Sequence, residues 1–212
     1  EVEQQLEEIN ETSIDTAAAN REDLSNLPFV TIDSAHTVDM DDALWIEAND
    51  QGWLIRIAIA DPVALINPET AIEKELIERG TSAYFPGESI PMLPPKITSD
   101  LGSLVEGKKR LAKVVELAID EKGQTLSGRV FAAIICSHKK LSYEQVQEAI
   151  LVGNDDSLEG FIPMLKMLQN ASLAMAAWRA EFALVHDGRP EFYMELNAQR
   201  KIANIVPKEL TV

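Results

Sequence analysis

Cysteine and long apolar runs are almost absent from this sequence. Cys136 is the single cysteine among 212 residues, which excludes an internal disulfide framework. No N-terminal hydrophobic segment and no long uncharged apolar run occurs, so the sequence favours neither secretion nor a membrane partner. With 46% hydrophobic residues, the chain can still bury one sizeable core. We therefore expect a folded protein in a reducing cytoplasm.

Positive charge is scarce as well. Lysine and arginine number 19 against 35 aspartates and glutamates, which gives a formal net charge of −16. Part of this excess is local, because residues 1–23 hold eight acidic residues and only Arg21 as a base. The most basic stretch contains Lys108, Lys109, Arg110 and Lys113. It could contact phosphate, and a solvated strand end is an equal alternative.

One stretch concentrates the acidic residues. Four carboxylates fall within ten residues, at Asp33, Asp39, Asp41 and Asp42. Segments rich in β-branched and aromatic residues lie on both sides, at residues 29–32 and 43–46, and are typical of strands. A sheet is therefore predicted to hold both ends of this loop and to keep its carboxylates close together.

Carboxylates held this close repel one another. Two of them about 4 Å apart repel by roughly 4 kcal/mol at an effective dielectric constant near 20, so a cation is expected among them. Oxygen ligands suit a hard cation such as Mg²⁺ or Mn²⁺, and no cysteine lies nearby for a thiolate zinc site. A calcium loop of the EF-hand type is excluded, because the central glycine and the closing glutamate are missing. A solvated acidic turn without metal is the alternative.

The pattern of the first half predicts both helices and strands. Residues 1–20 are predicted to form a short acidic helix over residues 2–9 and then a flexible linker, because few apolar residues mark a helical face. Residues 53–60 are apolar at nearly every position, which indicates a buried strand. Asp61 at its end could join the acidic cluster or cap the next segment. A helix is predicted from Asn67 to Gly80, followed by an ordered loop over residues 81–95.

The second half continues in the same mixed style. Two strand-like runs at residues 111–120 and 125–137 indicate a hairpin. Ser142 and Gln145 have the spacing of a capping box, which predicts a helix through residue 151. A long helix over about residues 158–182 and a strand at 192–196 follow. Together these elements predict an α+β fold with a mixed β-sheet and flanking helices.

Several motifs together resemble one known family. Residues 21–24, 27–33 and 39–43 are similar to the opening of the catalytic domain, called the RNB domain, of the ribonuclease II family. Further matches follow in the same order: residues 58–62, 84–87, 90–94 and 141–143. The resemblance covers about residues 21 to 205. The chain would then consist of an acidic segment over 1–20 and the N-terminal portion of an RNB catalytic domain over 21–212.

The resemblance implies a function and roles for the four carboxylates. The family's catalytic domain is a metal-dependent hydrolytic exoribonuclease that degrades single-stranded RNA from the 3′ end and releases nucleoside 5′-monophosphates. By resemblance, Asp33, Asp39 and Asp42 are ligands of Mg²⁺ or Mn²⁺. Asp41 orients the nucleophile or a second metal. Two metals about 3.5 to 4 Å apart would activate a water and stabilise the leaving oxygen.

The resemblance also implies three RNA contacts. Tyr84 matches an aromatic residue at the entrance to the RNA channel, and Tyr143 matches one near the scissile end of the RNA. The residues alone favour packing roles for both tyrosines. His186 stands where a bacterial member of the family has a phenylalanine that stacks on the terminal nucleotide, and histidine stacks less well.

Parts of the family's pattern are missing. The family carries a Ser-Pro-x-Arg motif whose arginine contacts the reacting phosphate, yet none of the ten prolines here follows a serine. We therefore expect a truncated or partial catalytic domain, whose partners would be single-stranded RNA and the remainder of the domain or another protein. With a net charge of −16, the chain alone should bind RNA weakly. The alternatives are a degenerate module that binds RNA or a protein without cleavage, and a structural domain stabilised by metal.

Overall fold

The computed structural model describes residues 1–86, 88–152, 158–182 and 192–207. Its helical elements are α1 (Val2–Glu8), α2 (Glu11–Ala18), the short 3-10 helix η1 (Pro62–Leu65), α3 (Ala71–Arg79), the π-helix η2 (Ile97–Leu101), α4 (Tyr143–Val152) and α5 (Ile162–Phe182). None of the described helices is long and apolar enough to cross a membrane.

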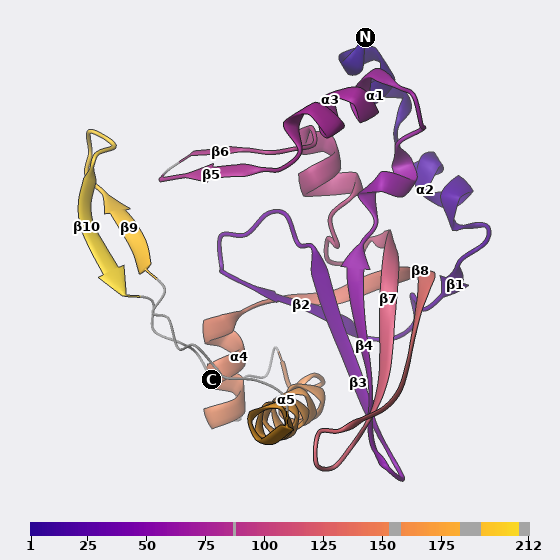
Figure 1. The fold of residues 1–212 in the computed structure, drawn as a ribbon, viewed down its shortest axis with the longest axis vertical. Coiled ribbons are helices and arrows are strands. Elements are labelled where there is room, and N and C mark those ends of the chain that lie inside the picture. Colours follow the sequence, from indigo (N-terminus) through magenta and orange to yellow (C-terminus); the bar gives the residue numbers. More distant parts are fainter. Residues whose placement is uncertain (87, 153–157, 183–191, 208–212) are drawn as a thin grey trace.

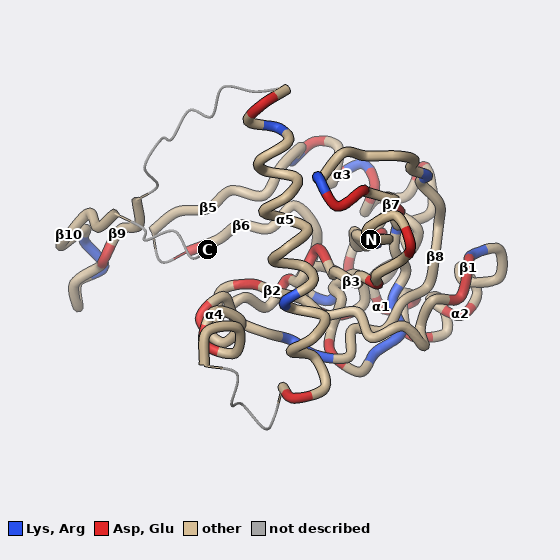
Figure 2. Tube along the Cα trace, turned by 90° about the horizontal axis from the view of Figure 1, so that it is seen from below, with Lys and Arg blue, Asp and Glu red and all other residues tan. Residues whose placement is uncertain are grey.

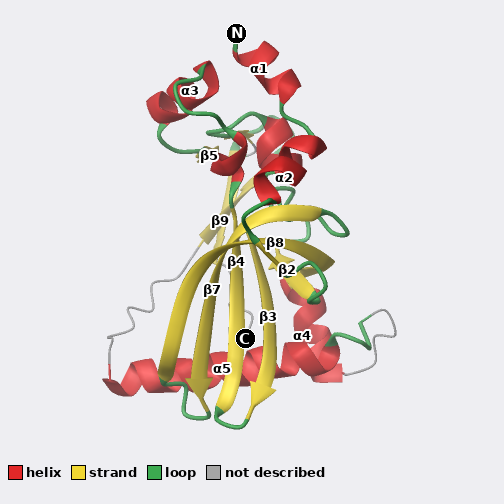
Figure 3. Ribbon diagram, turned by 90° about the vertical axis from the view of Figure 1, so that its right-hand side faces the viewer, coloured by secondary structure: helices red, strands yellow, loops and turns green. Residues whose placement is uncertain are grey.

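A mixed β-sheet forms the centre of the molecule (Figures 1 and 3). Its six strands are β1 (Glu22–Asp23), β2 (Phe29–Asp33), β3 (Asp42–Asn49), β4 (Gly52–Ala60), β7 (Lys109–Asp120) and β8 (Thr125–Ser142), in the order β1-β8-β2-β3-β4-β7. β8 is parallel to β1 and β2, and the other neighbours are antiparallel. The predicted α+β fold with a mixed sheet is confirmed.

The long strand β8 closes this sheet on itself. Its first part pairs with β7, from Thr125 to Cys136, and its last part pairs with β2, from Ser137 to Ser142. The predicted hairpin is therefore present as β7 and β8. Its second strand runs on to Ser142, five residues beyond the end that the sequence predicts, because β2 provides a second partner for its backbone.

The main core lies between the sheet and the helices α4 and α5. Phe29, Val30 and Ile135 of the sheet are fully buried, and Leu165 and Ala171 of α5 bury their side chains in the same cluster. Figure 3 shows α5 crossing the long strands near one end of the sheet. The capping box predicted for α4 is confirmed by reciprocal hydrogen bonds, in which the N–H groups of Ser142 and Gln145 each donate to the other's side chain.

A second core holds the N-terminal helices against the opposite end of the sheet (Figure 1). It contains Ile9, Ile14, Leu65, Ile72, Leu93, Ile97, Leu101, Leu111 and Ile134. The predicted helix over residues 2–9 is present as α1. The residues predicted as a flexible linker instead form α2, because Asn10 and Ser13 cap its start with reciprocal hydrogen bonds and Ile14 is only 2% exposed.

Two further predictions need correction in the segment between η1 and η2. The helix predicted from Asn67 begins later, as α3, with the hydroxyl of Thr70 accepting a hydrogen bond from the Glu73 N–H. Its predicted end at Gly80 is correct, since Gly80 adopts a left-handed conformation with φ of 67°. The ordered loop predicted for residues 81–95 contains a small hairpin, β5 (Ala83–Phe85) and β6 (Glu88–Ile90).

A second hairpin lies near the C-terminal end of the described chain. It joins β9 (Phe192–Leu196), where a strand is predicted, to β10 (Ile202–Pro207).

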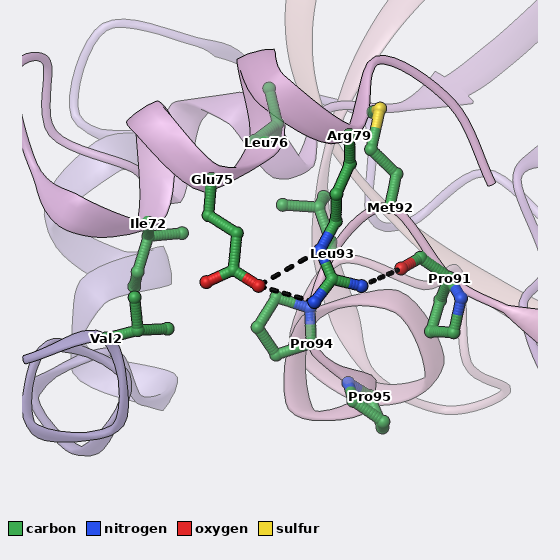
Figure 4. A pocket seen from close by; sticks show the side chains of 10 residues that line it. All are labelled: Val2, Ile72, Glu75, Leu76, Arg79, Pro91, Met92, Leu93, Pro94 and Pro95. Atoms are coloured by element: carbon green, nitrogen blue, oxygen red, sulfur yellow. Dashed lines mark hydrogen bonds and ion pairs between the residues drawn. The ribbon is translucent and has the colours of Figure 1, made fainter.

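An apolar groove of about 310 Å³ lies between α1, α3 and residues 91–95 (Figure 4). Val2, Ile72 and Leu76 line it together with the proline-rich segment, while the ion pair of Glu75 and Arg79 lies at its edge. The acidic stretch contributes no residue to this groove. The groove is therefore separate from the candidate site described below.

A row of alternating charges crosses the sheet. Arg56 of β4 pairs with Glu116 of β7 at 2.6 Å, and Glu116 also pairs with Arg129 of β8 at 2.6 Å. Arg129 then reaches Glu22 of β1 at 2.7 Å, and Arg56 stacks on Trp45 of β3. Hydrogen bonds from Arg129 and Arg56 lower the pKa of Glu116. We call Arg56, Glu116, Arg129 and Glu22 the charge row, in which each charge has an opposite neighbour.

Candidate functional site: an acidic loop between two paired strands

The four aspartates belong to one loop: two of them mark its ends and two lie between. Asp33 is the last residue of β2, and Asp42 is the first residue of β3. Asp39 and Asp41 lie in the connection between them. β2 and β3 pair in antiparallel fashion, so the sheet holds both ends of the loop as the sequence predicts. We call residues 33–42 the acidic loop.

The end of the acidic loop that leads into β3 is fixed by hydrogen bonds to its backbone. Met40 is 4% exposed, and its N–H donates to the hydroxyl of Ser103 at 2.9 Å. The Leu104 N–H donates to the Met40 carbonyl at 2.9 Å, and the Ala60 N–H donates to the Asp41 carbonyl at 2.8 Å. The loop is therefore a held structure, although most of its side chains reach the surface.

The carboxylates of the loop affect one another's protonation. Burial raises the pKa of Asp33, and the negative charges of Asp42, Asp41 and Asp39 raise it further. Burial also raises the pKa of Asp41, with the charges of Asp39 and Asp42 adding to the effect. For Asp42, burial alone raises the pKa. The repulsion expected from the sequence is thus a property of the folded chain.

One cation that the sequence analysis missed lies beside this cluster. Lys140 of β8 is opposite Thr31 of β2, and its ammonium group donates a hydrogen bond to the Thr37 carbonyl in the acidic loop. Its positive charge lowers the pKa of Asp33, against the larger effects that raise it. The parallel pairing of β8 with β2 joins segments about a hundred residues apart, so no local pattern indicates that Lys140 lies near the loop. The one hint in the sequence is that Lys140 directly precedes the family motif at residues 141–143.

The chemistry of the loop suits a hydrated hard cation. Oδ2 of Asp33 is buried and has no hydrogen-bond partner among the described residues. All candidate donors are carboxylate oxygens, which Mg²⁺ and Mn²⁺ prefer. Among the described residues, no three His, Cys, Asp or Glu side chains are gathered around one point as a complete metal site. Mg²⁺ keeps several waters and often uses only one or two carboxylates, so this arrangement fits such an ion without forming a closed cage.

The aromatic residues singled out by the sequence lie in different places. Asp33 pairs with Ser142 in the register of β2 and β8, so Tyr143 follows directly beside the acidic cluster, with 40% of its surface exposed. Tyr84 is 72% exposed on the hairpin of β5 and β6. In Figure 1 this hairpin projects on the same side of the molecule as the acidic loop. His186 lies outside the described residues.

Asp61 has a role that differs from both predicted ones. Its carboxylate pairs with Arg21 at 2.7 Å and with Lys113 at 3.6 Å. It makes no side-chain capping bond to η1. Arg21 also donates a hydrogen bond to the Ala112 carbonyl, so its side chain connects the segment before β1 to both Asp61 and β7. The predictions that Asp61 joins the cluster or caps the next segment are wrong, because its carboxylate is paired with Arg21 and Lys113.

The basic stretch near β7 is largely used inside the molecule. Arg110 is only 1% exposed and binds Glu11 of α2 and Asp100 of η2 at 3.0 Å each. Lys109 pairs with Asp23 at 3.4 Å. In Figure 2 the lysine and arginine positions are scattered over several elements of the described chain. For Arg110, both predicted roles, phosphate contact and solvated strand end, are wrong, because the guanidinium joins α2 and η2 to the sheet.

Comparisons with known proteins match this chain to one family. The RNB domain family matches residues 21–212. Exoribonuclease 2 of Aeromonas hydrophila is 38% identical over 187 residues, which cover 87% of this chain and 28% of that protein. Ribonuclease R of Vibrio cholerae is 37% identical over 211 residues, which cover 98% of this chain and 26% of that protein.

A solved structure has the same fold. Mycoplasma genitalium RNase R, in complex with ribose methylated single-stranded RNA, superposes with a TM-score of 0.91 at 26% sequence identity. The superposition covers 99% of this chain and 33% of that one. The chain thus spans about a third or less of the length of these relatives.

Proposed function

This chain belongs to the RNB domain family, and on that premise we propose that it forms the carboxylate-bearing part of a metal-dependent hydrolytic exoribonuclease. The whole protein degrades single-stranded RNA from its 3′ end and releases nucleoside 5′-monophosphates. One observation carries this proposal: the four aspartates occur at a loop held between paired strands, in a chain whose relatives are named exoribonuclease 2 and ribonuclease R. The single cysteine supports a reducing cytoplasm as its setting.

The aspartates of the acidic loop have two different roles in this proposal. Asp33, Asp39 and Asp42 would hold Mg²⁺ or Mn²⁺, and the buried Oδ2 of Asp33, which has no partner among the described residues, is a candidate ligand atom. When bound, such a cation supplies Lewis acidity and an activated water for attack on phosphorus. Asp41 would orient the attacking water or a second metal ion. Its carboxylate is well suited to this, because β4 fixes the Asp41 backbone while the side chain is exposed.

Aromatic side chains position the RNA in this proposal. Tyr143 follows Ser142, the β8 partner of Asp33, and its ring would contact the scissile end of the RNA. Tyr84 is exposed on a separate hairpin, where it can stack on an unpaired base further along the strand. A stacked base contributes about 1 to 3 kcal/mol with little sequence preference. His186 would take the terminal nucleotide.

The rest of the enzyme has to supply positive charge. Arg110, Lys109 and Lys113 are engaged in internal ion pairs. Loss of one electrostatic contact to the developing charge of the transition state typically costs about 3 to 4 kcal/mol, or roughly a hundredfold to a thousandfold in rate. The 212-residue chain alone should therefore hydrolyse RNA only marginally, and the remainder of the domain or a protein partner should complete the site.

The same ion pairs favour a second candidate function. A module that keeps its acidic loop but has committed its basic residues to internal contacts could bind RNA or a protein without cleaving it. The two functions differ in one respect. In a nuclease, Asp41 acts on the reacting centre and is dispensable for binding, whereas a binding module has no step that depends on it.

The test uses a longer protein in which this chain is joined to the remainder of the domain. A 5′-labelled single-stranded RNA is incubated with Mg²⁺ and followed for stepwise shortening. We expect Asp41→Asn to abolish cleavage and to leave RNA affinity nearly unchanged, because binding is spread over many contacts. Asp50→Asn, in the exposed turn between β3 and β4, is the matched control and should cleave as the parent does. Equal cleavage by parent and Asp41→Asn would remove Asp41 from the catalytic set, and no cleavage by the parent would favour the binding module.

A further inference from the structure

Ser103 lies beneath the acidic loop and has no exposed surface. Its hydroxyl accepts the Met40 N–H at 2.9 Å and lies 3.5 Å from the Met40 carbonyl, to which it can donate. The neighbouring Leu104 N–H also donates to this carbonyl, at 2.9 Å. Both polar backbone groups of Met40 are therefore held by one short segment, residues 103–104.

These hydrogen bonds act on two functional residues at once. The Met40 N–H belongs to the peptide plane that contains the Cα atom of Asp39, and the Met40 carbonyl belongs to the plane that contains the Cα atom of Asp41. Because each peptide unit is rigid, fixing its N–H or its carbonyl fixes the starting point of the neighbouring side chain. Because Met40 is 4% exposed, bulk water has little access to these two groups, which depend on partners inside the protein. Ser103 thus holds the backbone from which Asp39 and Asp41 project.

The segment that carries Ser103 is itself tightly placed. It follows the π-helix η2, a type of helix that often occurs near functional sites. The N–H of Gly102 donates to the Ile97 carbonyl at 2.8 Å. A Cβ atom at Gly102 would lie 2.7 Å from the Cβ atom of Pro62 and 2.8 Å from the Ile97 carbonyl oxygen, so a side chain there would push the segment away. This close packing leaves the Ser103 hydroxyl little freedom to move.

We propose that Ser103 is a positioning residue, which sets Asp39 and Asp41 in place for the divalent cation and for the attacking water. This inference rests on one part of the proposed function, namely that the acidic loop binds a divalent cation. Ser103 itself touches neither the metal nor the RNA; it acts through the Met40 backbone. Residues that hydrogen-bond the side chains of metal ligands typically change metal affinity by about 10-fold to 100-fold when they are replaced, and for Ser103, which acts through the backbone, we expect the lower end of this range.

The first test measures Mn²⁺ binding to the full 212-residue chain, by electron paramagnetic resonance of the free ion. We expect Ser103→Ala to bind Mn²⁺ about tenfold more weakly or worse than the parent. Ser137→Ala is the matched control, because Ser137 is 1% exposed and its hydroxyl also bonds a backbone carbonyl, that of Lys139, outside the acidic loop. It should keep the parent's affinity. Equal affinities of Ser103→Ala and the parent would overturn the proposal.

The second test needs no metal. Hydrogen–deuterium exchange is measured for residues 34–41 and, as an internal reference, for β7 in the same chain. We expect Ser103→Ala to speed exchange in the loop relative to β7, while Ser137→Ala does not. Ser103→Cys, which keeps the size of the side chain but is a weaker hydrogen-bond acceptor, should lie between parent and alanine variant in both tests.

The two tests separate the positioning role from the proposed function. A parent chain that binds no Mn²⁺ would contradict the metal site, and loop exchange would still decide whether Ser103 fixes the backbone. Unchanged loop exchange in Ser103→Ala would overturn the positioning role even if the parent binds Mn²⁺ well. A uniform increase over loop and β7 alike would show a merely structural serine and would also overturn it.

Discussion

The acidic loop and the charge row both place several charged residues on the same sheet, and they treat charge in opposite ways. In the charge row, signs alternate across β4, β7, β8 and β1, and every charge has an opposite neighbour. In the acidic loop, four negative charges share one short stretch, with Lys140 as the cation beside Asp33. Hydrogen bonds from the two arginines lower the pKa of Glu116. Burial raises the pKa values of Asp33, Asp41 and Asp42, and the neighbouring carboxylates add to this effect at Asp33 and Asp41.

The difference shows that the charge row stabilises the fold, whereas the acidic loop is a candidate functional site. Paired charges stabilise the ionised form and contribute to folding. Like charges held together destabilise the metal-free chain, and groups with strongly perturbed pKa values cluster at functional sites. The sheet provides both: the charge row helps to hold the strands on which the acidic loop depends.

The largest effect is expected when the charge row is broken at its centre. Glu116→Gln leaves Arg56 and Arg129 facing each other without the carboxylate between them. We expect a loss of about 2 to 3 kcal/mol in the free energy of unfolding, below the roughly 3 to 5 kcal/mol of fully buried pairs because Arg129 is half exposed. Urea unfolding at neutral pH measures this. Glu47→Gln, on the exposed part of β3, should change stability little.

The pH dependence of stability also tests the ion pairs of Glu116 with Arg56 and Arg129. Because the pKa of Glu116 is lowered in the folded chain, its contribution is present above the ordinary glutamate range and is lost as the pH falls through the lowered value. The difference in unfolding free energy between parent and Glu116→Gln should therefore shrink on acidification. A difference that is constant down to low pH would mean that the carboxylate charge is not what stabilises the row.

A smaller effect is expected at the cation of the acidic loop. Lys140→Met removes the hydrogen bond to the Thr37 carbonyl and the positive charge beside Asp33. In the presence of a chelator we expect a loss of about 1 kcal/mol in unfolding free energy. Lys139→Met is the matched control, because adjacent residues of a strand point to opposite faces of the sheet. Equal losses for the two lysines would show that Lys140 has no special relation to the loop.

The smallest effect has the opposite sign. Asp41→Asn removes one of the repelling charges, so the metal-free chain should gain from a few tenths to about 1 kcal/mol at neutral pH. Because the pKa of Asp41 is raised in the folded chain, the parent loses stability as the pH rises through that range, and the gain of the variant should vanish on acidification. Asp50→Asn should show no such gain. A destabilised Asp41→Asn in chelator would contradict the account of repulsion in the loop.

The local part of this structure could be predicted from the sequence. The acidic loop between two strands, the hairpin of β7 and β8, and the helices α4 and α5 follow from patterns of neighbouring residues. The capping box of α2 was a local signal too, and it was overlooked because the segment contains few apolar residues. Ile14 alone provides its buried side chain. The start of α3 was misplaced because Asn67 and Thr70 are both suitable capping residues and only packing decides between them.

The long-range part could not be predicted in this way. The closure of the sheet depends on β8 pairing with both β7 and β2, and no local pattern specifies that register. Lys140 and Ser103 reach the acidic loop through such contacts, across 103 and 63 positions of sequence. The same holds for Asp61, whose arginine partner lies 40 residues away. The roles of the four aspartates in metal binding and catalysis are still predictions.

The most direct test of the acidic loop as a cation site is a Mn²⁺ titration of the 212-residue chain and of one triple variant. Asp33→Asn, Asp39→Asn and Asp42→Asn are combined in a single chain, and Asp50→Asn serves as the control. The account predicts that the parent and the control bind Mn²⁺ at millimolar concentration or below, within the range of oxygen-ligand sites, and that the triple variant does not. Equal binding by parent and triple variant, or no binding by the parent, would contradict it.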